Sequence, residues 1–308
     1  MGFLERLKAD FVCLKASLRT LRLTTPIGKH PTRVFPAVVE ELANKFGDRP
    51  ALISEHETFS YRQLDERANR YARWARAQGL AKGDTVCLMM PNRPEYLAIW
   101  LGITRAGGVA ALINTNLTGQ SLCHCINIVT PKHIIVAAEF VDEVMAISSQ
   151  VTPAAKVWLH GDAPDGLPRI DKDVMTRSSD KLAADERCSL TVEDRALFIY
   201  TSGTTGMPKP ANINHYRLML ASHGFAGIMN TQPTDVSYDC LPMYHTVGGV
   251  VAPGAILLAG GSLVIREKFS AREFWDDVAR WNCTIFHYIG ELCRYLNNTP
   301  PHPKEELP

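Results

Sequence analysis

The chain has 308 residues, of which 46% are hydrophobic and 21% charged, enough for a sizeable core and two domains or subdomains. The formal net charge of +1 provides no overall field that would favour nucleic acid as a partner. The eight cysteines are scattered, and the Cys-His-Cys cluster at 123–125 lacks the spacing of a zinc site, so the pattern suits a reducing cytosol.

The N-terminal segment is predicted to form an amphipathic helix. Its apolar residues alternate spacings of three and four: Leu4, Leu7, Phe11, Leu14, Leu18 and Leu21. Charges at Glu5, Arg6, Lys8 and Asp10 exclude a secretory signal. A basic amphipathic helix lies on an anionic membrane surface or packs against protein, and its pattern does not choose between them. One expectation is therefore a cytoplasmic protein attached peripherally to the inner face of a membrane through residues 3–22.

Further helices and strands alternate along the chain. Helices are expected over 34–46, 60–78, 94–106, 119–129, 141–148, 214–228, 270–281 and 290–297. Strands are expected over 50–54, 86–90, 109–113, 133–137, 156–159, 196–200, 235–241, 262–266 and 283–288. Ser60 and Ser270 each begin a capping-box pattern, because Gln63 and Glu273 follow three residues later. The alternation predicts an α/β fold of βαβ units, with mostly parallel sheets and helices on both faces.

The composition suggests five segments. An N-terminal helix and linker at 1–30 precede a first α/β subdomain at 31–160, and a polar connecting loop follows at 161–190. A second α/β subdomain occupies 191–299, and a linker-like tail occupies 300–308. The longest charge-free run lies within the second subdomain. Because Pro253 and five glycines punctuate this run over 247–265, we interpret it as a buried helix, a Gly-Gly turn and a strand rather than a membrane span.

A glycine-rich stretch after the strand Ala196–Tyr200 points to phosphate binding. It reads Thr-Ser-Gly-Thr-Thr-Gly-Met-Pro-Lys over residues 201–209. Glycines allow close backbone approach, hydroxyls and successive N–H groups bind anions, and Lys209 supplies a point charge. The spacing excludes a Walker A loop, since only two residues separate Gly203 from Gly206. The stretch therefore predicts a different kind of polyphosphate-binding loop.

Aromatic and polar residues mark the ends of other strands. Tyr244 and His245 follow one strand, at the edge where open α/β sheets bind ligands. Tyr288 ends another and is either part of an apolar channel or part of the core. Asn114 and Asn116 follow a third strand, and we interpret them as turn residues without a chemical role.

Taken together, these residues resemble one family. The matching segments are 111–117, 200–209, 238–245 and 288–296. They are similar to the AMP-forming acyl-CoA synthetases of the fatty acid transport protein type, within the adenylate-forming superfamily. The resemblance extends from about residue 35 to the end and implies the N-terminal part of an adenylate-forming fold, with 191–299 as an incomplete AMP-binding subdomain.

The resemblance also implies a reaction. A long or very long chain fatty acid attacks ATP to give an acyl-adenylate, and coenzyme A then displaces AMP. The residues implied to hold ATP and Mg²⁺ are Thr201, Ser202, Gly203, Thr204, Thr205, Gly206 and Lys209, with Thr204 as the metal contact. Lys209 and His245 are the implied catalytic residues. The implied acyl-binding residues are Tyr244, His245, Tyr288, Gly290 and Glu291.

Two departures from the family pattern shape these expectations. Pro210 stands where the family usually has Gly or Ala, which removes an N–H beside Lys209. No Tyr-Gly-x-Thr-Glu motif is present, so we expect a truncated ligase with little activity alone. Alternatives are a non-catalytic fatty-acid or nucleotide-binding module and an adenylation domain for another carboxylic acid. No feature of the sequence indicates an oligomeric state.

Overall fold

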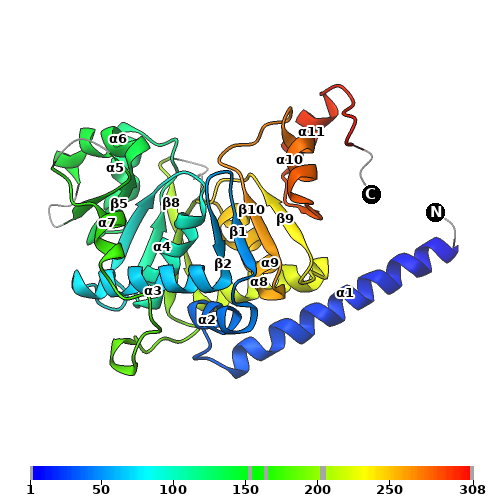
Figure 1. Ribbon diagram of the computed structural model, residues 1–308, viewed down its shortest axis with the longest axis horizontal. Coiled ribbons are helices and arrows are strands. Elements are labelled where there is room, and N and C mark those ends of the chain that lie inside the picture. Colours follow the sequence, from blue (N-terminus) through cyan, green and yellow to red (C-terminus); the bar gives the residue numbers. More distant parts are fainter. Residues whose placement is uncertain (1–2, 152–154, 163–165, 202–205, 306–308) are drawn as a thin grey trace.

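The computed structural model describes residues 3–151, 155–162, 166–201 and 206–305 (Figure 1). Within this part of the chain, strands and helices alternate as the sequence predicts. The helices are α1 (Phe3–Lys29), α2 (Phe35–Phe46), α3 (Tyr61–Ala77), α4 (Pro94–Arg105), α5 (Gly119–Asn127), α6 (Val141–Ala146), α7 (Ile170–Met175), α8 (His215–Met229), α9 (Ala252–Ala259), α10 (Phe274–Trp281) and α11 (Gly290–Asn297). Short 3₁₀ turns lie at Ala138–Phe140, Ser148–Gln150 and Ala184–Glu186.

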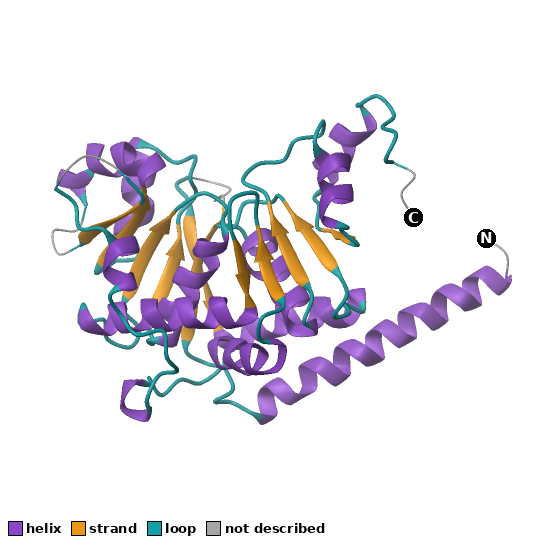
Figure 2. Ribbon diagram, in the orientation of Figure 1, coloured by secondary structure: helices purple, strands orange, loops and turns teal. Residues whose placement is uncertain are grey.

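Two sheets form the centre of the described structure (Figure 2). Sheet A is 5-stranded in the order β11-β9-β10-β1-β2, and sheet B is 6-stranded in the order β6-β5-β3-β4-β7-β8. Sheet A contains β1 (Pro50–Ile53), β2 (Thr58–Ser60), β9 (Val236–Asp239), β10 (Ser262–Ile265) and β11 (Ile285–Phe286). Sheet B contains β3 (Thr85–Met89), β4 (Val109–Leu112), β5 (His133–Ala137), β6 (Lys156–His160), β7 (Arg195–Thr201) and β8 (Lys209–Asn214). Among the described strands, only β2 and β8 pair antiparallel with their neighbours, and each lies at an edge. The predicted α/β class is confirmed.

Successive side chains point to opposite faces of each sheet, and each face packs into its own apolar layer. In β3, Val86 and Leu88 join a central core with α2, α3, α4, α8 and α9, whereas Cys87 and Met89 face α5 and α6. Sheet A behaves alike, since Leu263 faces the central core and Val264 faces α10 and α11. Figure 1 shows α5 and α6 beyond sheet B and α10 and α11 beyond sheet A. Both sheets therefore share one helical layer and are covered on both faces.

The sheets interleave along the sequence. β1, from the predicted first subdomain, pairs with β10 from the second, with Leu52 opposite Leu263. β7, from the second, pairs with β4 from the first, with Leu112 opposite Ile199. The boundaries between the sheets thus differ from the five segments expected from composition. That division of the chain into folding units remains a prediction.

The two capping-box patterns have different outcomes. Ser60 caps α3 as predicted, because its hydroxyl accepts from Gln63 N at 3.1 Å and Gln63 Oε1 accepts from Ser60 N at 2.9 Å. The prediction at Ser270 is wrong, since α10 begins only at Phe274. The Glu273 carboxylate binds Arg266 at 2.8 Å, so it is not available to complete a box with Ser270.

The predicted N-terminal helix is present, and it docks through its small residues. Thr20 packs against Gly227 of α8, and the Arg19 guanidinium donates to Gly227 O at 3.0 Å. Leu18 lies two positions, or about 200° around the helix, from Thr20 and is 57% exposed. Figure 1 shows the N-terminal half of α1 extending away from the sheets. The leucine stripe is therefore not covered by the described part of the protein.

The charge-free run also follows its prediction. A π-helical turn over Val247–Val251 leads into α9, Gly260 ends α9 in a left-handed conformation, and β10 follows. No described helix is long and apolar enough to cross a membrane.

Candidate active site

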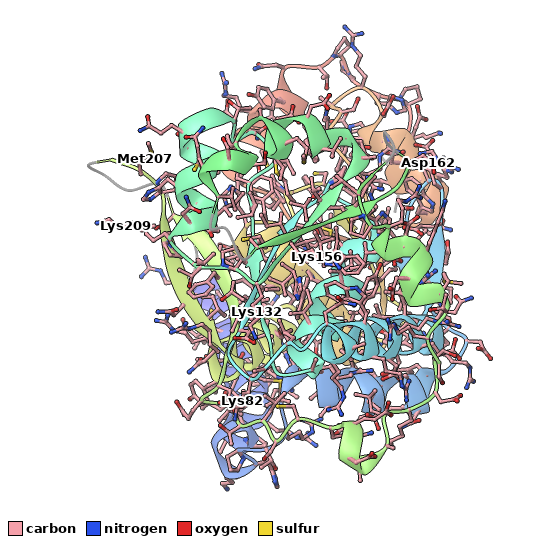
Figure 3. The ribbon with its side chains drawn as sticks, turned by 90° about the vertical axis from the view of Figure 1, so that its left-hand side faces the viewer. Lys82, Lys132, Lys156, Asp162, Met207 and Lys209 are labelled. Carbon is pink, nitrogen blue, oxygen red and sulfur yellow. The ribbon has the colours of Figure 1, made fainter. Side chains whose placement is uncertain are left out.

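The predicted phosphate loop connects β7 to β8. These strands pair antiparallel, with Thr201 opposite Lys209, so the two ends of the loop meet at the carboxyl end of β7. The Thr201 hydroxyl lies 3.4 Å from Lys209 O. The predicted residues Ser202, Gly203, Thr204 and Thr205, including the expected metal contact, lie outside the described residues. Gly206 and Lys209 are exposed beside them, and Figure 3 shows Met207 and Lys209 close together at the rim of the molecule.

Helix α5 supports both ends of this loop from behind. The Tyr200 hydroxyl donates to Cys125 O at 2.6 Å, and a His124 ring nitrogen lies 3.1 Å from Pro208 O. The Ser121 hydroxyl lies 3.6 Å from the Met207 sulfur. These contacts therefore hold the described residues on both sides of the loop against α5.

Pro210 is accommodated because β8 is an edge strand. It pairs with Tyr200 in the register of the hairpin. Proline is tolerated at sheet edges, where its missing N–H interrupts no further ladder. The extended conformation that Pro210 favours at Lys209 is the one that β8 requires.

The second predicted constellation lies across the seam between the two sheets. Tyr244 is buried, and its hydroxyl accepts from the Asn116 side chain at 3.1 Å. Asn116 follows β4, the neighbour of β7, so the exits of β4 and β7 lie side by side. The structure therefore brings the phosphate-loop strand and Tyr244 to neighbouring strand ends. The sequence interpretation of Asn116 as a turn residue without chemistry missed this contact.

His245 follows Tyr244 and keeps access to solvent. The rings of Tyr244 and His245 have centroids 4.6 Å apart. Partial burial lowers the pKa of His245 below its ordinary value, which favours the neutral imidazole at neutral pH. Burial raises the pKa of the Tyr244 phenol, which therefore stays protonated. The pair thus offers a neutral, polar boundary to a ligand.

Two cavities open along the same edge. The smaller, of about 290 Å³, is lined by Tyr244, Asn116 and Phe140 among others. The larger, of about 800 Å³, lies between the carboxyl ends of strands from both sheets. The residues shared by the two cavities are Asn92, Glu139, Glu267 and Lys268. The position agrees with the rule that open α/β sheets bind ligands beyond the carboxyl ends of their strands.

The wall of the larger cavity contains a buried polar cluster. Burial raises the pKa of the Glu95 carboxyl, which accepts from the Tyr71 hydroxyl and lies 3.5 Å from Arg67. Burial lowers the pKa of His160 to about 4, and its Nε2 lies 4.0 Å from Glu95 Oε1. Sequence reasoning did not identify this cluster, because its members come from α3, α4 and β6.

The remaining predicted acyl-binding residues lie on the surface. Tyr288 is 57% exposed, and Gly290 and Glu291 are exposed at the start of α11. Glu291 pairs with Arg294 one turn later. Their proposed place in an acyl channel remains a prediction. Their neighbour His287 is buried, and its Nδ1 lies 2.8 Å from the Ser237 hydroxyl.

Comparison with known proteins identifies the family. The model of the AMP-binding enzyme family matches residues 39–308. The chain belongs to the AMP-binding enzyme family. It is 37% identical over 279 residues to long-chain fatty acid transport protein 1 of Homo sapiens, a match that covers 89% of this chain and 42% of that protein. It is 31% identical to the medium/long-chain-fatty-acid–CoA ligase FadD6 of Mycobacterium tuberculosis, over 87% of this chain and 44% of the ligase. The resemblance found in the sequence is therefore confirmed.

Solved structures agree with this assignment. ATP-bound MatB of Rhodopseudomonas palustris superimposes with a TM-score of 0.75 at 30% identity, covering 86% of this chain and 51% of MatB. The inhibitor-bound N-terminal domain of FACL13 from Mycobacterium tuberculosis has a TM-score of 0.79 at 24% identity, over 87% of this chain and 65% of that domain, and supports the fold alone. The chain spans less than half the length of these curated relatives.

Proposed function

We propose that this chain binds ATP and a long or very long chain fatty acid at the shared carboxyl edge of its sheets. The proposed reaction is ATP-dependent activation of the fatty acid to acyl-CoA through an acyl-adenylate. The observation that carries the proposal is the meeting of two strand ends, where Asn116 joins the exit of β4, beside β7, to Tyr244. The family match supports the same chemistry.

The described flanks of the loop suit a polyphosphate. Lys209 is exposed at the start of β8, and within the described ranges no ion pair engages it. An exposed ammonium group beside a glycine-rich loop is a suitable point charge for phosphate. Together with the loop hydroxyls, Lys209 would bind the phosphates, and Thr204 would contact Mg²⁺. The metal supplies charge neutralisation on the leaving pyrophosphate. Coenzyme A would be the acceptor of the acyl group.

Calorimetric titration with MgATP tests the nucleotide part of the proposal. We expect Lys209→Ala to weaken binding by about 1.5–3 kcal/mol, the usual range for a charged hydrogen bond. Lys172→Ala is the matched control, because Lys172 is exposed on α7, away from the loop. Equal affinities for the two variants would contradict the assignment of Lys209.

Isotope exchange between ATP and pyrophosphate separates the alternatives. We expect weak exchange that depends on oleate and stays well below that of an intact ligase, and this result would support the acyl-adenylate reaction. Binding of oleate and MgATP without exchange would favour a non-catalytic module. Exchange that responds to aryl or amino acids in place of oleate would favour adenylation of another carboxylic acid.

We also propose that α1 attaches this protein peripherally to the cytoplasmic face of a membrane. Its leucine stripe is exposed, with Leu14 at 56% and Leu21 at 59%. Lys8, Lys15 and Arg22 recur every seven positions, so they align along one side of that stripe. Apolar side chains flanked by basic ones suit the surface of an anionic bilayer. The free cysteines throughout the described chain suit the reducing cytosol.

Sedimentation with anionic liposomes tests this attachment. Deleting residues 1–24 should release the protein into the supernatant, whereas replacing Lys8, Lys15 and Arg22 by glutamine should weaken binding mainly at low salt. Unchanged co-sedimentation after the deletion would rule out α1 as the anchor.

A further inference from the structure

A single asparagine holds the segment that leads to Tyr244 and His245. Asn92 lies between β3 and α4, at the seam of the two sheets. Its side-chain amide donates to Leu241 O at 2.8 Å and to Arg266 O at 3.1 Å, while its oxygen accepts from Met243 N at 2.8 Å. One side chain that follows a strand of sheet B thus contacts the backbone just after both β9 and β10 of sheet A.

Other contacts of this segment hold its two ends rather than its middle: Leu241 N donates to Asp239 Oδ1 at 3.1 Å before the turn. Pro242 has no N–H, and the turn continues through a bond from His245 N to Pro242 O at 3.0 Å. Two glycines of the π-helical turn, Gly248 and Gly249, pack closely against the backbone of this segment. A Cβ on Gly248 would lie 2.5 Å from Leu241 O, and one on Gly249 would lie 1.9 Å from Met243 O. Residues 241–243 are therefore enclosed between the Asn92 amide and the backbone of the π-helical turn.

We propose that Asn92 is a positioning residue that sets the directions of Tyr244 and His245. Its amide fixes residues 241–243, and the Asn116 contact then fixes the Tyr244 hydroxyl. Asn92 also lines both cavities, so it stands where they meet. Loss of this amide releases the turn and exposes His245 further. The consequence for ligands rests on the proposed function, whereas the consequence for His245 does not.

Asn92→Asp is the sharpest variant, because it keeps the size of the side chain and the acceptor for Met243 N. It replaces the donor with an oxygen that faces Leu241 O and Arg266 O, and these contacts become repulsive. Asn44→Asp is the matched control, since Asn44 is exposed on α2 and undergoes the same change of charge. Asn92→Ala removes the same donors without adding a charge, and it replaces the Asp variant if that variant does not fold.

The test is a proton NMR titration of the full chain, with the His245 resonance assigned by its loss in His245→Gln. We expect the pKa of His245 to rise in Asn92→Ala, which adds no charge, because burial lowers this pKa in the wild type. In Asn92→Asp the new carboxylate favours the protonated imidazole as well. We expect oleate affinity to fall about tenfold, and Asn44→Asp to match the wild type in both measurements. An unchanged His245 titration in folded Asn92→Asp or Asn92→Ala would overturn the proposal. A shifted titration without oleate binding in any variant would leave Asn92 as the positioning residue and contradict the proposed function instead.

Discussion

At the scale of single residues, several histidine side chains lie in surroundings that disfavour their charged form. His215 has no exposed surface, and neither of its ring nitrogens has a hydrogen-bond partner within the described chain. Burial lowers its pKa to about 4. His160 and His287 are lowered to about 4 for the same reason. The folded protein therefore holds these imidazoles neutral under conditions where the unfolded chain protonates them.

The consequence is a stability that falls with acidity. Unfolded histidine titrates near pH 6.5, so between about pH 6.5 and 4 the unfolded state binds more protons than the folded state. The contribution of His215 is complete above this window and is lost as the pH falls through it. We expect His215→Gln to reduce the slope of the unfolding free energy against pH. The loss of unfolding free energy between about pH 6.5 and 4 should become smaller by at most about 3 kcal/mol.

Urea unfolding at a series of pH values measures this slope. His56→Gln is the control, since His56 is exposed between β1 and β2. Parallel slopes for wild type and His215→Gln would show that burial of His215 does not drive the acid sensitivity.

Residue types alone predicted part of the candidate site. Tyr244 and His245 were predicted because ligands bind at strand ends in α/β sheets. The roles of Asn92 and Asn116 were missed, because asparagine after a strand usually marks a turn. Their contacts join residues 128 to 151 positions apart in the sequence. Residue spacing does not predict contacts over such separations.

At the scale of elements, the two capping-box patterns show the limit of a local signature. The same spacing gives a closed box at Ser60 and none at Ser270. A stronger, charged partner decides the difference, since Arg266 binds Glu273. Local sequence therefore placed the helices well but could not reveal this competition from the neighbouring strand.

This contrast gives a matched pair of variants. We expect Ser60→Ala to lower the free energy of unfolding by about 1 kcal/mol, the typical cost of losing an N-cap. Ser270→Ala should change it by less than about 0.5 kcal/mol, as for a surface substitution. Urea denaturation of both variants checks the pair, and equal losses would show that the boxes do not differ in solution.

The contact between α1 and α8 provides a second matched pair. A Cβ on Gly227 would lie 2.6 Å from the Thr20 Cα, whereas one on Gly224 would meet nothing within 4 Å. We expect Gly227→Ala to displace α1 and cost about 1–3 kcal/mol through overpacking. Gly224→Ala should stabilise α8 by up to about 1 kcal/mol. Tryptic cleavage within α1 measures the displacement, and equal protection in both variants would contradict the docking.

At the scale of the whole molecule, the sequence predicted the class and not the arrangement of the sheets. Alternating strands and helices indicated parallel sheets, which the structure has. The pairing of β1 with β10 joins residues such as Leu52 and Leu263, far apart in sequence. Such pairings depend on how several apolar faces pack together in space. Changes in composition along the chain therefore do not predict which strands pair. The seam that holds Tyr244 arises from this interleaving.

Calorimetric titration with oleate in the presence of MgATP decides whether this seam binds a long-chain fatty acid. We expect oleate to bind and benzoate not to bind under the same conditions. His245→Ala should weaken oleate binding at least about tenfold. His30→Ala should not weaken it, because His30 is exposed after α1 and lines none of the cavities at this edge. Binding of benzoate as tight as that of oleate, or equal oleate affinity in His245→Ala and His30→Ala, would contradict fatty-acid binding at this seam.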